Sequence, residues 1–179
     1  MQEPEVSLRI AMNYIRDGRT SADVTVSIDG AHIKTKDTTH FDLTDFMSRN
    51  GYVKCDGDDR RWQGMYHTPG YSQRIVVSSQ PGVGDVSIVL NNGKILYIES
   101  KKFKSGSGGE YPAMREAIGQ LMTGCPDRPN ITPVVAVPYS EKSEELARKW
   151  SYNERIRSAG ICFILVYDNG NVTFINGNN

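Results

Sequence analysis

The second half of the chain alternates apolar strand-like segments with amphipathic helical ones, in an order that few folds accommodate. From Arg74 onward the segments follow each other as strand, strand, strand, helix, strand, helix, strand. The strands are expected at residues 74–78, 85–90, 95–101, 131–137 and 161–167, and the helices at residues 112–123 and 140–158. Helices between apolar strands imply crossover connections. This order predicts an α/β fold with a mixed β-sheet flanked by helices.

Residues 85–101 have the pattern of a β-hairpin around an Asn-Asn-Gly loop. In a three-residue loop whose glycine is left-handed, Leu90 lies opposite Lys94. Counting back from that pair sets Asp85 opposite Glu99. The same register forms an apolar face from Val86 with Ile98 and from Ile88 with Leu96. A two-residue turn would bury one carboxylate among aliphatic side chains at a cost of several kcal/mol, so the three-residue loop is favoured.

Asp85, Glu99 and Lys101 are the candidate catalytic residues. Glu99 and Lys101 are two positions apart on one strand, so they point to the same face. Two adjacent carboxylates repel each other, and a hard divalent cation such as Mg²⁺ or Mn²⁺ relieves that repulsion with few protein oxygens. The Lys101 amine can orient or help to deprotonate a water and can stabilise charge on a phosphate. These groups suit hydrolysis of a phosphodiester by a metal-activated water.

Two parts of this pattern resemble a known family. Gly84-Asp85, the strand pair and Glu99-Ser100-Lys101 resemble the PD-(D/E)xK motif of the restriction-endonuclease-like nuclease superfamily. Residues 117–121, Ala-Ile-Gly-Gln-Leu, are similar to the glutamine-bearing helix that follows the motif in many members. The resemblance covers roughly residues 41–167. The sequence departs from the motif name at Gly84, where the name has proline.

The resemblance implies a Mg²⁺-dependent (or Mn²⁺-dependent) endodeoxyribonuclease of a prokaryotic or phage-like restriction, repair or recombination system, with a 5′-phosphate product. It implies Asp85 and Glu99 as metal ligands with the Ser100 carbonyl as a candidate third, Lys101 as the catalytic lysine and Gln120 as a site-supporting residue. Many members also carry a glutamate on a first helix. Here that helix is expected at residues 41–50, where Asp42 or Asp45 would have to serve.

Two other classes of function remain open. A catalytically inactive nucleic-acid-binding or assembly subunit could have the same fold. Alternatively, Glu99 and Lys101 could form a solvated ion pair of little energetic weight in a module that binds no nucleic acid.

The first 36 residues are expected to form a small N-terminal extension, a helix plus a β-hairpin, ahead of a nuclease-like domain at residues 37–179. Apolar residues at helical spacing predict a helix over residues 6–16. Alternating residues 24–28 precede an Asp-Gly pair, which predicts a hairpin with a return strand at residues 32–36.

The charge balance excludes proteins that bind polyanions through bulk charge. The 179 residues include 21 Lys and Arg and 21 Asp and Glu, so the formal net charge is zero. DNA binding then requires a local basic patch, and tight binding requires a homodimer that pools two patches or a partner subunit. Candidate residues for the patch are Lys102 and Lys104 beside the motif, and Arg60 and Arg61 beside Trp62.

The remaining composition predicts a cytoplasmic protein without a membrane anchor. No apolar run approaches the roughly 18 residues of a spanning helix, and the acidic N-terminus lacks the layout of a secretion signal. The three cysteines are far apart and odd in number, which favours reduced thiols: Cys55, Cys125 and Cys162. The three histidines lack metal-ligand spacing and are expected at the surface or as caps: His32, His40 and His67.

Overall fold

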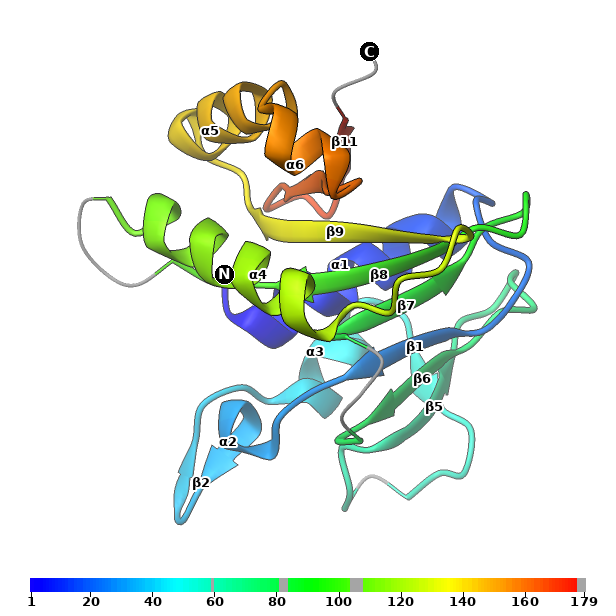
Figure 1. Ribbon diagram of the computed structural model, residues 1–179. Coiled ribbons are helices and arrows are strands. Elements are labelled where there is room, and N and C mark those ends of the chain that lie inside the picture. The colour runs from blue at the N-terminus through cyan, green and yellow to red at the C-terminus, as the bar shows by residue number, and fades with distance from the viewer. Residues whose placement is uncertain (59, 81–83, 104–107, 177–179) are drawn as a thin grey trace.

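The computed structural model describes residues 1–58, 60–80, 84–103 and 108–176. These residues form an α/β protein around a nine-stranded mixed sheet with the strand order β11-β10-β9-β8-β7-β1-β6-β5-β4 (Figure 1). Its strands are β1 (Val24–Ser27), β4 (Val53–Lys54), β5 (Gly64–His67), β6 (Ile75–Ser78), β7 (Val86–Val89), β8 (Ile95–Ser100), β9 (Ile131–Pro138), β10 (Cys162–Val166) and β11 (Val172–Ile175). A separate two-stranded sheet pairs β2 (Lys34–Thr35) with β3 (Thr38–Thr39). The α/β class and the mixed sheet expected from the sequence are confirmed.

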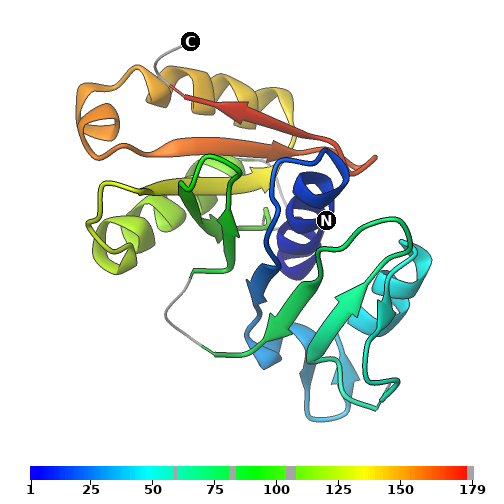
Figure 2. The same ribbon diagram turned by 90° about the vertical axis from the view of Figure 1, so that its right-hand side faces the viewer.

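Helices cover both faces of the sheet. They are α1 (Glu3–Arg16), α2 (Gly30–Ile33), α3 (Leu43–Arg49), α4 (Glu110–Gly124), α5 (Glu141–Ser151) and α6 (Glu154–Ser158). Figure 1 and Figure 2 show α1 on one side of the sheet, with α4 and α5 on the other. Alternate residues of β8 accordingly belong to two cores, because Leu96 and Ile98 pack with the α1 side chains and Tyr97 packs with those of α4.

The first 36 residues supply part of this sheet and core. The apolar stripe of α1 is buried against the sheet. Strand β1 lies between two neighbours, since Val26 pairs in parallel with Val77 of β6 and in antiparallel with Val86 of β7. Residues 1–36, which the sequence predicts to be a small extension, therefore contribute β1, an interior strand of the sheet, and α1, the helix that covers one face of it.

The prediction that β1 and residues 32–36 form a hairpin is wrong. The Asp29 carboxylate accepts a 2.9 Å hydrogen bond from the backbone N–H of Ala31 and caps α2. The Asp-Gly pair thus begins a helical turn, and β2 pairs with β3 rather than with β1. Asp and Gly favour turns and helix starts alike, so the pair alone does not decide between them.

The register expected for the central hairpin is confirmed. The N–H of Leu90 donates to the Lys94 carbonyl at 2.8 Å, and Gly93 has a φ of +81°. Val86 pairs with Ile98, and the next pair along the apolar face follows, Ile88 with Leu96. Asp85, which directly precedes β7, therefore lies across from Glu99.

Two further expectations differ from the structure. The single helix expected over residues 140–158 is two helices, because the Asn153 side chain accepts hydrogen bonds from Arg155 and Ile156 and starts α6. Residues 56–70 are polar and contain glycines, which predicts a surface loop, but they include β5, which pairs with β6 and buries Tyr66.

Among the described residues, no helix is long and apolar enough to cross a membrane.

Candidate functional site

The candidate site lies where β7 begins and β8 ends. The backbone N–H of Ser100 donates a 2.7 Å hydrogen bond to Asp85 Oδ2, and the Asp85 N–H donates to the Ile98 carbonyl at 2.8 Å. These two bonds hold the Asp85 side chain beside the end of β8, where Glu99 lies. The structure therefore brings together the two carboxylates that the hairpin register predicts to face each other.

Gly84 allows this close approach of the chain to β8. Its φ is +70°, and a Cβ at this position would lie 2.9 Å from the Ile98 carbonyl oxygen and 2.9 Å from the Tyr97 ring. Proline, whose φ is fixed at about −65°, cannot adopt that conformation. The departure from the motif name thus has a local cause, since only glycine fits here without strain.

The two carboxyl groups resist ionising together. Burial, followed by the negative charge of Glu99, raises the pKa of Asp85 to about 7, against the opposing effects of the Ser100 N–H and of Lys101. Burial also raises the pKa of Glu99, while Lys101 and a hydrogen bond with Asp85 act to lower it. A half-buried pair of acids in this state gains stability from a cation placed between them.

Lys101 follows β8 directly and is only 8% exposed. Its Nζ lies 3.5 Å from Glu3 Oε1 and 3.6 Å from Glu116 Oε1. Burial acts to lower the pKa of Lys101, but Glu3, then Asp85, Glu116 and Glu99 outweigh it and raise that pKa. The side chain is therefore a fixed ammonium at neutral pH, placed at the carboxylate pair.

Glu3, on the first turn of α1, is a site residue that sequence reasoning missed. Asp42 and Asp45, considered for an acidic role on the helix expected at 41–50, lie elsewhere. Asp42 caps α3 by accepting from the Asp45 N–H at 3.0 Å, and Asp45 pairs with Arg49. The apolar stripe of α1 was the available signal, because it places the helix against the sheet and its first turn at the sheet edge.

Helix α4 contributes Glu116 to the surroundings of Lys101 and also carries Gln120. Glu116 contacts Lys101, and a Cβ added at Gly124 would lie 3.8 Å from the Tyr97 hydroxyl. Gln120 lies one turn after Glu116 on the same helix. Its side chain is exposed. Glu116 was not singled out from the sequence, because its spacing from the motif carries no pattern.

The donor set fits a hard divalent cation. Within the described residues, no cluster of three or more His, Cys, Asp or Glu side chains is arranged to hold a metal ion. Mg²⁺, however, is commonly bound through one or two carboxylates plus water. Ser100 adds a backbone oxygen: its N–H points to Asp85 on the β7 side, and a residue of an antiparallel pair presents its N–H and C=O to the same neighbour.

The basic residues proposed for nucleic-acid binding do not form one patch. Lys102 is exposed beside the site, and its Nζ donates to Gln2 Oε1 at 2.9 Å. Lys104 lies outside the described residues. Arg60 and Arg61 are exposed near β5, which is separated from β8 by β6, β1 and β7, and Arg60 pairs with Asp58 at 2.9 Å.

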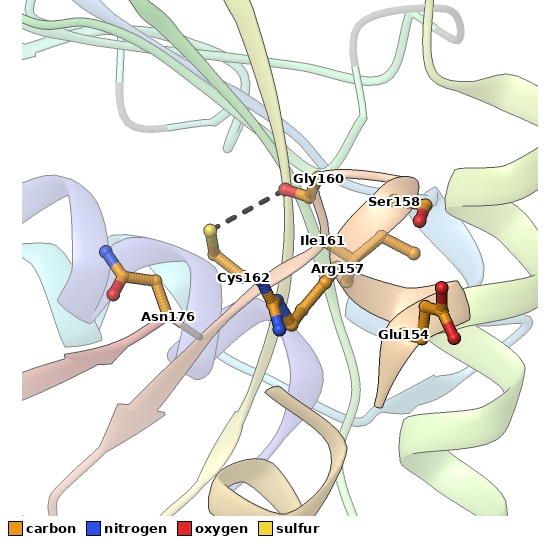
Figure 3. Close-up of a pocket in the computed structure, with 7 residues that line it drawn as sticks. All are labelled: Glu154, Arg157, Ser158, Gly160, Ile161, Cys162 and Asn176. Carbon is orange, nitrogen blue, oxygen red and sulfur yellow. Dashed lines mark hydrogen bonds between the residues drawn. The ribbon is translucent and has the colours of Figure 1, made fainter. Parts of the chain in front are cut away.

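A cavity of about 540 Å³ lies away from this site, at the start of β10 (Figure 3). Its lining residues are Glu154, Arg157, Ser158, Gly160, Ile161, Cys162 and Asn176. The Cys162 thiol donates to the Gly160 carbonyl at 3.6 Å, and burial raises the pKa of that thiol to about 11. The thiol therefore stays protonated and unreactive at neutral pH.

Comparison with known proteins adds no assignment. No protein-family model, curated protein or solved structure matches this chain. The geometry of Asp85, Glu99 and Lys101, with the groups that surround them, is what indicates a function.

Proposed function

We propose that the protein is a metal-dependent endonuclease that hydrolyses DNA phosphodiester bonds and has the restriction-endonuclease-like fold. One observation carries the proposal: Asp85 and Glu99 form a half-buried acidic pair at adjoining strand ends, with the buried Lys101 ammonium beside them. Lys101 is buried and the two carboxylates are half-buried, which argues against a merely solvated ion pair, because an exposed pair would not require the fold to desolvate these charges.

In this proposal the carboxylates of Asp85 and Glu99 and the carbonyl of Ser100 hold Mg²⁺ or Mn²⁺. When bound, the ion supplies a Lewis acid that polarises a phosphoryl oxygen and lowers the pKa of a coordinated water. The Ser100 N–H keeps the Asp85 carboxylate aimed at the pair. The Lys101 ammonium orients the attacking water and stabilises the negative charge that develops on the phosphate.

Glu3 and Glu116 position Lys101 from opposite faces of the sheet. Glu3 comes from α1 and Glu116 from α4, so the ammonium is held between two carboxylates that belong to different helices. Glu3 also supports the fold proposal, because it supplies the glutamate that many members of the superfamily carry on a first helix. We propose that Gln120, which is exposed on α4, supports the site.

The neutral net charge of the chain bears on how DNA would be held. With 21 basic and 21 acidic residues, bulk attraction to DNA is absent. We therefore propose that tight DNA binding depends on a homodimer or a partner subunit, in addition to Lys102 beside the site.

Cleavage assays on supercoiled plasmid, linear duplex and single-stranded DNA, with and without Mg²⁺ or Mn²⁺, test the function. The wild type is expected to cleave only with the metal, and Asp85→Asn and Lys101→Met are each expected to lose at least about a hundredfold in rate. Asp45→Asn and Lys149→Met, exposed residues far from the pair, serve as matched controls.

Equal cleavage by all five proteins would reveal a contaminating nuclease and overturn the proposal. Metal and DNA binding by the wild type without any cleavage would instead identify a catalytically inactive nucleic-acid-binding or assembly subunit.

A further inference from the structure

Two adjoining cavities lead away from Asp85 past His32. The smaller, of about 40 Å³, has Glu3, His32 and Asp85 among its lining residues. The larger, of about 250 Å³, shares Pro4 and His32 with the smaller one. The residues lining it are Gln2, Pro4, Ala31, His32, His40 and Lys102. The shared residues thus connect the cavity beside Asp85 to the second, larger cavity.

The larger cavity presents nitrogen donors, and its six lining residues include no carboxylate. Lys102 contributes an exposed ammonium that is anchored to the Gln2 side chain at 2.9 Å. His40 Nε2 lies 2.5 Å from the Thr35 hydroxyl, which can donate to it and leave Nδ1–H as a donor. A cationic amine and a ring N–H around a small hollow are suited to a tetrahedral anion.

We propose that this cavity binds a phosphate group of a nucleic-acid strand, with Lys102 supplying the charge and His40 a ring N–H. The identity of the strand rests on the proposed nuclease function, whereas phosphate binding itself requires no cleavage. Lys101 and Lys102 are consecutive, so one backbone segment places one ammonium at the acidic pair and the next at this cavity. The phosphate held here is therefore a neighbour of the one at which hydrolysis would occur.

The histidines provide a direct readout by NMR of the imidazole rings. The chain has three histidines: His32 and His40 line the cavity, and His67 lies on β5, far along the sheet. The protein is titrated in EDTA with inorganic phosphate and with a short single-stranded DNA oligonucleotide, carrying either a 5′-phosphate or a 5′-hydroxyl. The His32 and His40 signals are expected to shift, and the His67 signal to stay in place.

The two oligonucleotides separate the sources of the phosphate. A shift with the 5′-phosphorylated strand alone identifies a terminal monophosphate as the ligand, whereas equal shifts identify an internal phosphodiester. Lys102→Ala is expected to weaken the binding about tenfold, the loss of one charge-assisted hydrogen bond, and Lys149→Ala, an exposed lysine on α5, to leave it unchanged.

Three results would overturn the proposal: no shift at His32 and His40, an equal shift at His67, or equal binding by Lys102→Ala and the wild type. Because the titration contains no divalent metal, its outcome is separate from cleavage. Ring shifts in a protein that never cleaves would refute only the nuclease function, and cleavage without ring shifts would refute only the phosphate cavity.

Discussion

Lys101 Nζ lies 3.5 Å from Glu3 Oε1, although 98 positions separate the two residues. The contact joins the first turn of α1 to the end of β8, at the acidic pair formed by Asp85 and Glu99. Glu3 Oε1 also lies 3.6 Å from His32 Nδ1, so the same carboxylate contacts both the lysine and a histidine that lines the proposed phosphate cavity. In the proposed mechanism, Glu3 determines where the Lys101 charge is held.

Glu3→Gln is expected to lower kcat about tenfold with little change in KM, because it loosens the Lys101 ammonium without removing a substrate contact. Glu5→Gln on the same helix, whose carboxylate pairs with Arg9 at 2.8 Å, is the matched control and is expected to cleave like the wild type. Steady-state cleavage of an oligonucleotide measures both. Equal kcat values for the two variants would remove Glu3 from the site.

Gly84→Ala is expected to destabilise the protein by about 2–4 kcal/mol and to abolish cleavage, because the strain of a positive φ adds to a clash with β8. Gly93→Ala is the matched control: its φ is +81°, but a Cβ there meets nothing within 4 Å. That variant is expected to lose only about 1 kcal/mol and to keep its activity. Urea unfolding and cleavage rates distinguish the two variants. Similar losses of stability and of activity in both would contradict the close approach of the chain to β8 at Gly84.

Without metal, the stability of the protein is expected to fall as the pH rises from about 4 to about 7. In the folded protein the pKa of Asp85 is raised from 3.8 to about 7, so within this window the folded state binds more protons than the unfolded state. Raising the pH through the folded pKa therefore removes stability. The raised pKa of Glu99 acts in the same direction.

Asp85→Asn removes this dependence and keeps an oxygen to accept from the Ser100 N–H. In EDTA near pH 8, we expect the variant to be about 1–2 kcal/mol more stable than the wild type, with the difference vanishing near pH 4. Thermal unfolding across the pH range measures it. A wild type that is stabilised by rising pH, relative to the variant, would show that the Asp85 carboxylate is not desolvated by the fold.

Deleting residues 1–36 is expected to prevent folding. The deletion removes α1, which covers one face of the sheet, and β1, the shared partner of β6 and β7. Replacing residues 34–39, which form only the exposed β2–β3 sheet, with a short Gly-Ser linker is the control and is expected to fold. Circular dichroism and thermal unfolding report on both. A cooperative transition in the 37–179 fragment would establish the first segment as a dispensable extension.

The central hairpin could be predicted because its determinants are local. A glycine-containing loop and an alternating apolar face fix the register, and the register alone sets Asp85 across from Glu99. The helix over residues 6–16 and the buried strands β9 and β10 were also evident, since long apolar patterns reflect burial directly.

The contacts of α1 and β1 could not be predicted in the same way. Strand β1 pairs with β6 and β7, and α1 packs across strands from β1 to β10, so their places depend on packing between distant segments. The Glu3 and Glu116 carboxylates reach Lys101 only through that packing. Gln120 is exposed on α4. The sequence motif does not indicate which way its side chain points.

The account depends on Asp85 and Glu99 sharing one divalent cation, and anomalous scattering from crystals soaked in Mn²⁺ tests this most directly. The predicted result is an anomalous peak bridging the carboxylate oxygens of Asp85 and Glu99 beside the Ser100 carbonyl, and no such peak in crystals of Asp85→Asn. A wild-type map without Mn²⁺ at that position, at a Mn²⁺ concentration that saturates known metal-dependent nucleases, would contradict the account.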